Sequence, residues 1–135
     1  MIFSDGGARG NPGPAAIACL ITAENGSVVM AKSRYIGLHT NNQAEYEALI
    51  MALESAMTLG AEEAVCHLDS ELVSKQLNGE YAVKNPALKQ MWNKVQELKW
   101  RFKKVCFVNV PRANNFIQKA DKLVNETLDA APSKN

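Results

Sequence analysis

The sequence predicts an α/β fold, a mixed five-stranded sheet with helices on both faces. Strand-like and helix-like segments follow one another as three strands, a helix, a strand, two helices, a strand and a helix. An Asn25-Gly26 step between two apolar runs predicts that the sheet opens with an antiparallel hairpin. The composition, 47% hydrophobic and 21% charged, is that of a globular chain, and no repeat or linker divides it.

The first half of the chain is predicted to hold three strands and one long helix. Apolar runs place the strands at residues 2–4, 15–22 and 28–35, with a glycine-rich loop between the first two. The helix is predicted over 42–59, because apolar residues recur there at intervals of three and four and Gly60 suits the position after a helix end. Its apolar positions are Ala44, Ala48, Leu49, Ala52, Leu53, Ala56 and Met57.

The second half alternates short strands with helices. A strand is predicted at 64–68 and a short helix at 70–77, which Asn78-Gly79 ends. Asn85-Pro86 supplies a cap and a first residue for a helix to about residue 98, with Leu88, Met91, Trp92, Val95 and Leu98 inward. A strand at 105–110, a loop at 111–115 and a helix at 120–130 follow. We expect one domain over residues 1–131 and a short polar tail over 132–135.

The formal charge of +1 hides an uneven distribution. Residues 1–83 carry 4 basic and 10 acidic groups, whereas residues 84–104 carry 7 basic and 1 acidic. A basic segment can follow a phosphate backbone, although a solvated helix face accounts for the lysines equally well. The near-neutral total excludes a uniformly basic nucleic-acid coat and an acidic disordered tail.

The cysteines indicate the compartment. Cys19, Cys66 and Cys106 lie in separate apolar runs, with no C-x-x-C pair and no histidine at ligand spacing. Free thiols in a reducing cytoplasm explain this pattern better than a disulfide or zinc framework. No apolar run approaches the roughly 20 residues that a bilayer span needs. We therefore expect a cytoplasmic protein without a membrane partner.

Four carboxylates stand where sites are often built. Asp5 ends the first predicted strand and leads into the glycine-rich loop. Asp69 stands at the carboxyl end of a predicted strand, where open α/β folds bind ligands. Glu45 lies beside the apolar stripe of the long helix, and Asp121 begins the last helix. Each has a structural alternative: Asp69 could cap the next helix, and a carboxylate in a first helical turn complements the helix dipole.

Together the acids indicate metal-dependent phosphoryl chemistry. Converging carboxylates repel one another unless divalent cations neutralise them. Oxygen-only ligands favour Mg²⁺ or Mn²⁺, and two such ions about 4 Å apart can hold the attacking and leaving oxygens of a phosphodiester. The glycine-rich segment after Asp5 lets the backbone approach a ligand closely, although a tight strand connection explains it as well.

Four segments, in this order, resemble type 1 ribonuclease H, and the likeness spans nearly the whole chain. They are Asp5-Gly6-Gly7 with Gly10-Asn11-Pro12-Gly13-Pro14, Thr40-Asn41-Asn42-Gln43-Ala44-Glu45, Leu68-Asp69-Ser70-Glu71-Leu72-Val73, and Val110-Pro111-Arg112 leading to Ala120-Asp121-Lys122-Leu123. The match is to a microbial subgroup with a Val-Pro-Arg segment and no basic protrusion.

The resemblance implies an endoribonuclease that cuts the RNA strand of an RNA–DNA hybrid and leaves 5′-phosphate and 3′-hydroxyl ends. It implies two Mg²⁺ or Mn²⁺ ions per active site. Asp5 would bridge both ions and Asp121 would help to hold the ion that activates the attacking water. Glu45 and Asp69 would hold the ion at the leaving oxygen.

The resemblance also implies hybrid contacts. The glycine loop, Asn11 and Glu45 would face the minor groove, where the 2′-hydroxyls of RNA are exposed. Thr40, Asn41 and Arg9 match positions that contact backbone phosphates in this family. The full set of substrate-binding candidates is Gly6, Gly7, Arg9, Asn11, Thr40, Asn41, Asn42, Ser70 and Glu71.

The chain departs from the family pattern before the last acid. Many relatives carry a histidine there, whereas His39 and His67 lie elsewhere, and we expect His67 to be packed rather than catalytic. Arg112 is the nearest candidate for the role. An arginine cannot act as a base at neutral pH, so the role of Arg112 would be electrostatic. The alternative is that Pro111-Arg112 only marks the change from strand to loop and has no role in catalysis. The loop before Asp121 is also longer than the subgroup pattern.

Other functions stay open at this point. A related nuclease could act on double-stranded RNA or DNA junctions. A non-catalytic hybrid-binding module would be expected to have lost at least one acid, and all four are present. We expect a monomer without an obligate protein partner.

Overall fold

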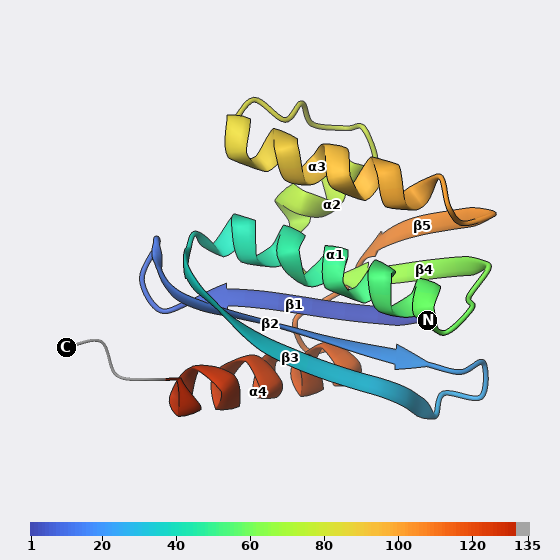
Figure 1. Ribbon diagram of the computed structural model, residues 1–135, viewed down its shortest axis with the longest axis horizontal. Helices are drawn as coiled ribbons and strands as arrows, with labels where there is room; N and C mark the ends of the chain where they lie inside the picture. The colour runs from blue at the N-terminus through green and yellow to red at the C-terminus, as the bar shows by residue number, and fades with distance from the viewer. Residues whose placement is uncertain (132–135) are drawn as a thin grey trace.

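The structure, a computed structural model, describes residues 1–131 and has a five-stranded sheet at its centre (Figure 1). The predicted polar tail, residues 132–135, lies outside the described residues. The strands are β1 (Ile2–Ala8), β2 (Gly13–Thr22), β3 (Val28–His39), β4 (Glu63–Leu68) and β5 (Lys104–Asn109). The helices are α1 (Asn41–Thr58), α2 (Glu71–Leu77), α3 (Pro86–Lys99) and α4 (Asn115–Ala130).

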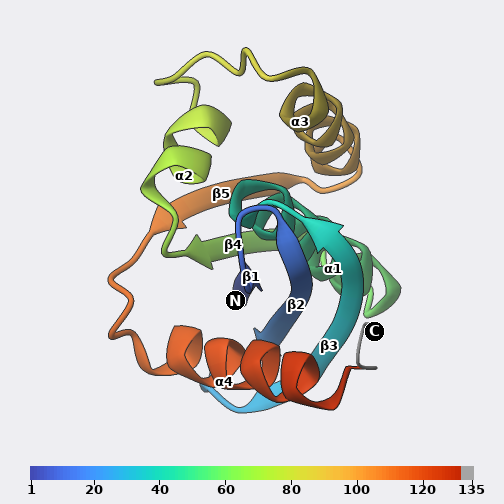
Figure 2. The same cartoon turned by 90° about the vertical axis from the view of Figure 1, so that its left-hand side faces the viewer.

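The sheet is mixed, which confirms the predicted fold class. Its strand order is β3-β2-β1-β4-β5; β1 pairs antiparallel with β2, and β2 with β3, whereas β1 pairs parallel with β4, and β4 with β5. Helix α4 lies on one face of the sheet and α1 on the other, with α3 packed against α1 (Figure 2). Because β1 and β4 run in the same direction, their carboxyl ends meet at one edge of the sheet.

Small residues let α1 lie close to the sheet. Ala44, Ala48, Ala52 and Ala56 are buried along one side of this helix, and the predicted leucines between them are buried as well. Thr40 begins α1 with a capping box, in which its hydroxyl accepts from the Gln43 backbone and its own backbone N–H donates to the Gln43 side chain. Gly60 follows the helix with φ +81°, as predicted.

The first strand is longer than predicted, because β1 continues past Asp5 to Ala8. Gly6 and Gly7 pair with Ile17 and Ala16 of β2, so the glycines belong to the sheet. A Cβ atom at Gly6 would collide with the backbone carbonyl of Ala44 in α1. Close packing between helix and strand therefore explains this glycine, and the segment that joins β1 to β2 shortens to residues 9–12.

The predicted start of the last helix is also wrong. Helix α4 begins at Asn115, five residues before the predicted position, because Asn114 is its N-cap and accepts from the backbone N–H groups of Phe116 and Ile117. Ile117 is fully buried in a cluster with Phe3. Asp121 is consequently the seventh residue of the helix, about two turns from its N-terminus.

One further boundary differs by more than two residues, and the others lie within two residues of the prediction. Strand β3 continues to His39, four residues beyond the predicted end, and α1 follows it almost at once. Ser70, placed within the predicted short helix, is the N-cap of α2. Within residues 1–131, none of the helices is both long and apolar enough to cross a membrane.

Candidate active site

Three of the predicted acids meet at the edge where β1 and β4 lie side by side. Asp5 comes from β1, Asp69 follows β4, and Glu45 reaches across from α1. Each offers a carboxylate oxygen, and these three oxygens lie within 4.8 Å of one another. Asp5 and Glu45 are only 7% and 8% exposed, so the cluster is largely withdrawn from water.

Gly6 fixes the position of Glu45. The Gly6 backbone N–H donates a hydrogen bond of 2.7 Å to Glu45 Oε1. The bond is possible because Gly6, lacking a Cβ, allows the first turns of α1 to approach β1. The same glycine thus sets the packing of the helix and the orientation of the carboxylate.

Burial raises the pKa of two acids of the cluster, Asp5 and Glu45. Desolvation, together with the charges of Asp69 and Asp121, raises the pKa of Asp5 from 3.8 to about 8. Desolvation, followed by the charge of Asp5, raises the pKa of Glu45 well above its ordinary value. A carboxyl group with a pKa of about 8, as for Asp5, holds its proton at neutral pH unless a cation replaces it. An all-oxygen donor set of three acids fits a hard divalent cation such as Mg²⁺ or Mn²⁺.

Asp121 approaches the cluster from the other face of the sheet. It lies on α4, is exposed, and raises the pKa of Asp5 through its charge and a side-chain contact. The side-chain amide of Asn125, one turn later, donates to Asp121 O at 3.1 Å and to Asp121 Oδ2 at 3.4 Å. The motifs in the sequence did not single out Asn125; its four-residue spacing from Asp121 was the available signal.

Arg112 lies at the mouth of the cluster. Its Nε is 3.5 Å from Asp69 Oδ2, and its side chain is 87% exposed. A shallow open depression collects these residues and several of the predicted substrate contacts. It is lined by Asp5, Gly6, Asn41, Asn42, Glu45, Asp69, Ser70 and Arg112.

Two asparagines tie the β1–β2 connection to the start of α1. The Asn41 backbone N–H donates to Asn11 Oδ1 at 3.0 Å, and the Ala8 backbone N–H donates to Asn41 Oδ1 at 2.9 Å. Their carbonyl oxygens are therefore used within the protein. Their side-chain NH₂ groups, which have no hydrogen-bond partner within residues 1–131, remain as donors, and Asn41 lines the same depression as the acids.

Other predicted contacts are engaged elsewhere. Arg9 forms a 2.7 Å ion pair with Asp129 of α4, and Glu71 pairs with Lys75 at 2.9 Å. Thr40 and Ser70 serve as N-caps, and Gly7 lies within β1.

The histidines stay outside the cluster. His67 stacks on Phe3 at 4.5 Å between ring centroids, and its Nδ1 lies 3.0 Å from Ile2 O, so it is packed as predicted. His39 ends β3.

Comparison with known proteins identifies the family. A family model described as "Reverse transcriptase-like" matches residues 3–127. The crystal structure of RNase H1 from Halobacterium salinarum superposes with a TM-score of 0.92 at 42% identity, covering 96% of this chain and 97% of that one. This chain belongs to the type 1 ribonuclease H family. The family is generally dependent on divalent metal, which agrees with the acid cluster.

Further ribonuclease H relatives resemble the chain over almost all of its length. LC11-RNase H1, from compost and solved in complex with RNA/DNA hybrid, has a TM-score of 0.91 at 46% identity and 98% coverage of both chains. The curated ribonuclease HI of H. salinarum is 43% identical over 96% of this chain, and the bifunctional protein Rv2228c of Mycobacterium tuberculosis is 43% identical over 97%. The chain spans 64% of the first protein and 36% of the second.

Proposed function

We propose that this chain is an endoribonuclease that hydrolyses the RNA strand of an RNA–DNA hybrid and leaves 5′-phosphate and 3′-hydroxyl ends. The observation that carries the proposal is the convergence of Asp5, Glu45 and Asp69, with Asp121 beside Asp5. Membership of the ribonuclease H family supports it, as does a relative solved with RNA/DNA hybrid. Residues 1–131 would form the catalytic domain.

The acid cluster is proposed to hold two Mg²⁺ or Mn²⁺ ions. Bound there, the ions would supply Lewis-acid stabilisation of the attacking and leaving oxygens of the phosphodiester. Asp5 and Asp121 would help to hold the ion that activates the attacking water, and Asp5, Glu45 and Asp69 the ion at the leaving oxygen. Arg112 would place its positive charge near Asp69, where the product phosphate leaves.

The free amide groups of Asn11 and Asn41 favour recognition of the hybrid. Both can donate to acceptors in a minor groove, where the 2′-hydroxyls of the RNA strand are found. Asn41 lines the same depression as the acids and Asn11 contacts Asn41, so recognition of the ribose and cleavage would occur on the same stretch of duplex. Asn42 and Ser70, in the same depression, would complete the contact.

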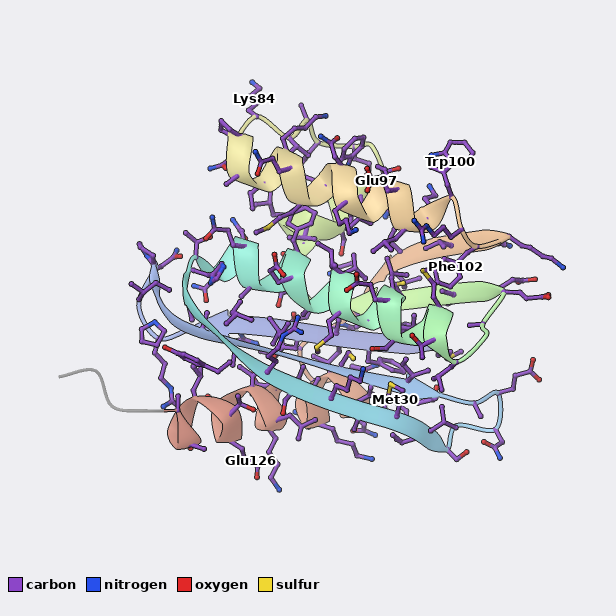
Figure 3. All side chains as sticks on the ribbon, viewed as in Figure 1. Met30, Lys84, Glu97, Trp100, Phe102 and Glu126 are labelled. Atoms are coloured by element: carbon purple, nitrogen blue, oxygen red, sulfur yellow. The ribbon has the colours of Figure 1, made fainter. Side chains whose placement is uncertain are left out.

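The basic segment, residues 84–104, would bind a part of the duplex that lies at a distance from the bond that is cut. Figure 3 shows Lys84 before α3 and Trp100 after it, both pointing away from the sheet. The seven cations of residues 84–104 are all exposed, with the apolar stripe of the helix turned inward. This arrangement suits a phosphate backbone, which attracts cations regardless of sequence.

The three cysteines support a cytoplasmic protein. Cys19, Cys66 and Cys106 are free thiols within the described chain. Burial raises the pKa of Cys19 to about 11 and that of Cys66 to about 12, so both resist oxidation. We propose a monomer, since the acid cluster is assembled entirely from one chain.

A substrate panel with the purified protein tests the proposal. We expect cleavage of a labelled RNA strand in a hybrid with Mg²⁺ or Mn²⁺, and no cleavage of duplex DNA. Asp69→Asn should bind the hybrid but not cut it, because it removes a proposed ligand from the cluster. Equal cleavage of double-stranded RNA or of DNA junctions would favour the related nuclease. Binding without cleavage in the unmodified chain would favour the non-catalytic module.

A further inference from the structure

Asn125 connects the acid on α4 to the rest of the site through its side-chain amide. Its NH₂ group donates toward Asp121, and its carbonyl Oδ1 lies 3.5 Å from the Arg9 guanidinium. Arg9 also donates to the backbone carbonyl of Asn125 at 3.4 Å and pairs with Asp129. We propose that Asn125 is a positioning residue that holds the Asp121 carboxylate toward Asp5, and that Arg9 fixes the direction of the Asn125 amide.

The polarity of the contacts sets the direction of the amide. A guanidinium only donates hydrogen bonds and a carboxylate only accepts them. The Asn125 carbonyl therefore belongs on the Arg9 side and its NH₂ on the Asp121 side, as in the structure. A reversed amide would place its NH₂ against a cation and its carbonyl against an anion.

Asp121 needs such a partner because its other side-chain contact is with a second acid, Asp5. It is exposed on the second turn of α4, where its side chain can rotate freely. The nearby acid Asp5 repels it electrostatically whenever both are ionised. A donor that acts on the carboxylate oxygen from one turn away limits this rotation, as partners of ligand side chains do in metal sites generally.

Arg9 thus has a place in the site that differs from the predicted phosphate contact. It reaches α4 from the β1–β2 connection, which also carries Asn11. The contact joins the proposed substrate loop to the helix that bears Asp121. This inference rests on the proposed function, because it assigns Asn125 and Arg9 to the support of that same site.

Replacing Asn125 separates positioning from stability. The residue is exposed on a helix, where alanine has the higher intrinsic helix propensity, so Asn125→Ala is expected to fold at least as stably as the unmodified chain. Asn125→Gln keeps an amide that can reach a carboxylate four residues away on a helix. Gln118→Ala removes an exposed amide of the same helix that makes no side-chain hydrogen bond within residues 1–131, and serves as the control.

The experiment measures Mg²⁺ binding both without substrate and during cleavage. Mg²⁺ alone is titrated while the backbone amide signals of Gly6 and Gly7 are followed by NMR. The Mg²⁺ dependence, kcat and KM are then measured on a hybrid. For Asn125→Ala we expect the half-saturating Mg²⁺ concentration to rise roughly tenfold and kcat to fall, with KM for the hybrid unchanged. Asn125→Gln should recover most of the loss, and Gln118→Ala should match the unmodified chain.

Several results would overturn the inference. Asn125→Ala with unmodified Mg²⁺ affinity and kcat would show that the amide does not act through Asp121. A rise in KM alone would assign Asn125 to hybrid binding, and a glutamine variant as impaired as the alanine variant would exclude the amide contact. Failure of the unmodified chain to cleave any hybrid would refute the proposed function instead, while the Mg²⁺ titration without substrate would still decide the role of Asn125.

Discussion

Replacing Asp5 by asparagine should make the metal-free protein more stable while abolishing cleavage. The pKa of Asp5 is raised from 3.8 to about 8 by burial and by neighbouring acids, so the ionised carboxylate destabilises the folded chain. Each pKa unit is worth about 1.4 kcal/mol, and even a quarter of this difference exceeds about 1 kcal/mol. Asparagine has a similar shape, carries no charge and can donate to Glu45.

The effect has a definite pH dependence. Between pH 3.8 and about 8 the unfolded chain has released the Asp5 proton, whereas the folded chain retains it. The folded state then binds more protons than the unfolded state, so the free energy of unfolding falls as pH rises through this window and levels off above it. Glu45 acts in the same direction. The metal-free protein should therefore be more stable near pH 5 than near pH 8, and Asp5→Asn should reduce this difference.

The assay is thermal or urea unfolding in a chelator at both pH values. In a chain of 135 residues, a gain of about 1 kcal/mol corresponds to a rise in Tm of roughly 3–5 °C. Glu24→Gln, which neutralises an exposed acid in the β2–β3 turn, is the control and should change little. Added Mg²⁺ should stabilise the unmodified protein but not Asp5→Asn, because only the former keeps the full ligand set. Equal stability of the two proteins in chelator near pH 8 would refute the reasoning.

Three further predictions concern the proposed catalysis, the packing and the binding. Arg112→Ala should lower kcat about tenfold without changing Mg²⁺ affinity, because Arg112 contributes positive charge beside Asp69 from an exposed position. Steady-state kinetics measure this. A variant with the same kcat as the unmodified enzyme would show that Arg112 has no role in catalysis. Gly6→Ala should lower the free energy of unfolding by about 1–3 kcal/mol, because the added methyl group meets the Ala44 backbone, and urea unfolding measures this. Hybrid affinity, measured by fluorescence anisotropy, should fall steeply with salt if residues 84–104 contact phosphates, whereas a salt-independent Kd would remove them from the interface.

Most of the fold could be predicted because its signals are local. The apolar spacing of α1, the Asn85-Pro86 start of α3 and the Asn25-Gly26 turn each identify an element within a few residues of chain. Two of the errors, at the end of β1 and at the start of α4, arise where the signal is not local. Gly6 looks like a loop residue in the sequence, and only the approach of α1 explains a glycine inside a strand.

The start of α4 was missed for a related reason. Four of the six residues 114–119 are polar, and the two apolar residues of the first turn, Phe116 and Ile117, pack against residues from β1 and β2. The motif singled out Asp121 in the sequence, but it could not tell how the helix presents this side chain. Asn125 could not be predicted as a site residue, because one of its contacts is with Arg9, 116 residues before it in the sequence.

The N-caps of α1, α2 and α4 are other residues than the acids, which excludes helix capping as the reason for these carboxylates. Thr40, Ser70 and Asn114 occupy the N-cap positions, so Asp69 caps nothing. Glu45 and Asp121 lie beyond the first turn of their helices, where the dipole no longer stabilises a carboxylate appreciably.

What remains is a group of carboxylates in which burial and neighbouring acids raise the pKa of Asp5 and of Glu45. Such a group destabilises the metal-free fold, so its presence is explained by a bound cation and by the reaction that the cation supports. Neutralising an acid of the cluster should therefore abolish cleavage and raise the free energy of unfolding of the metal-free protein. Neutralising an acid outside the cluster should change neither quantity.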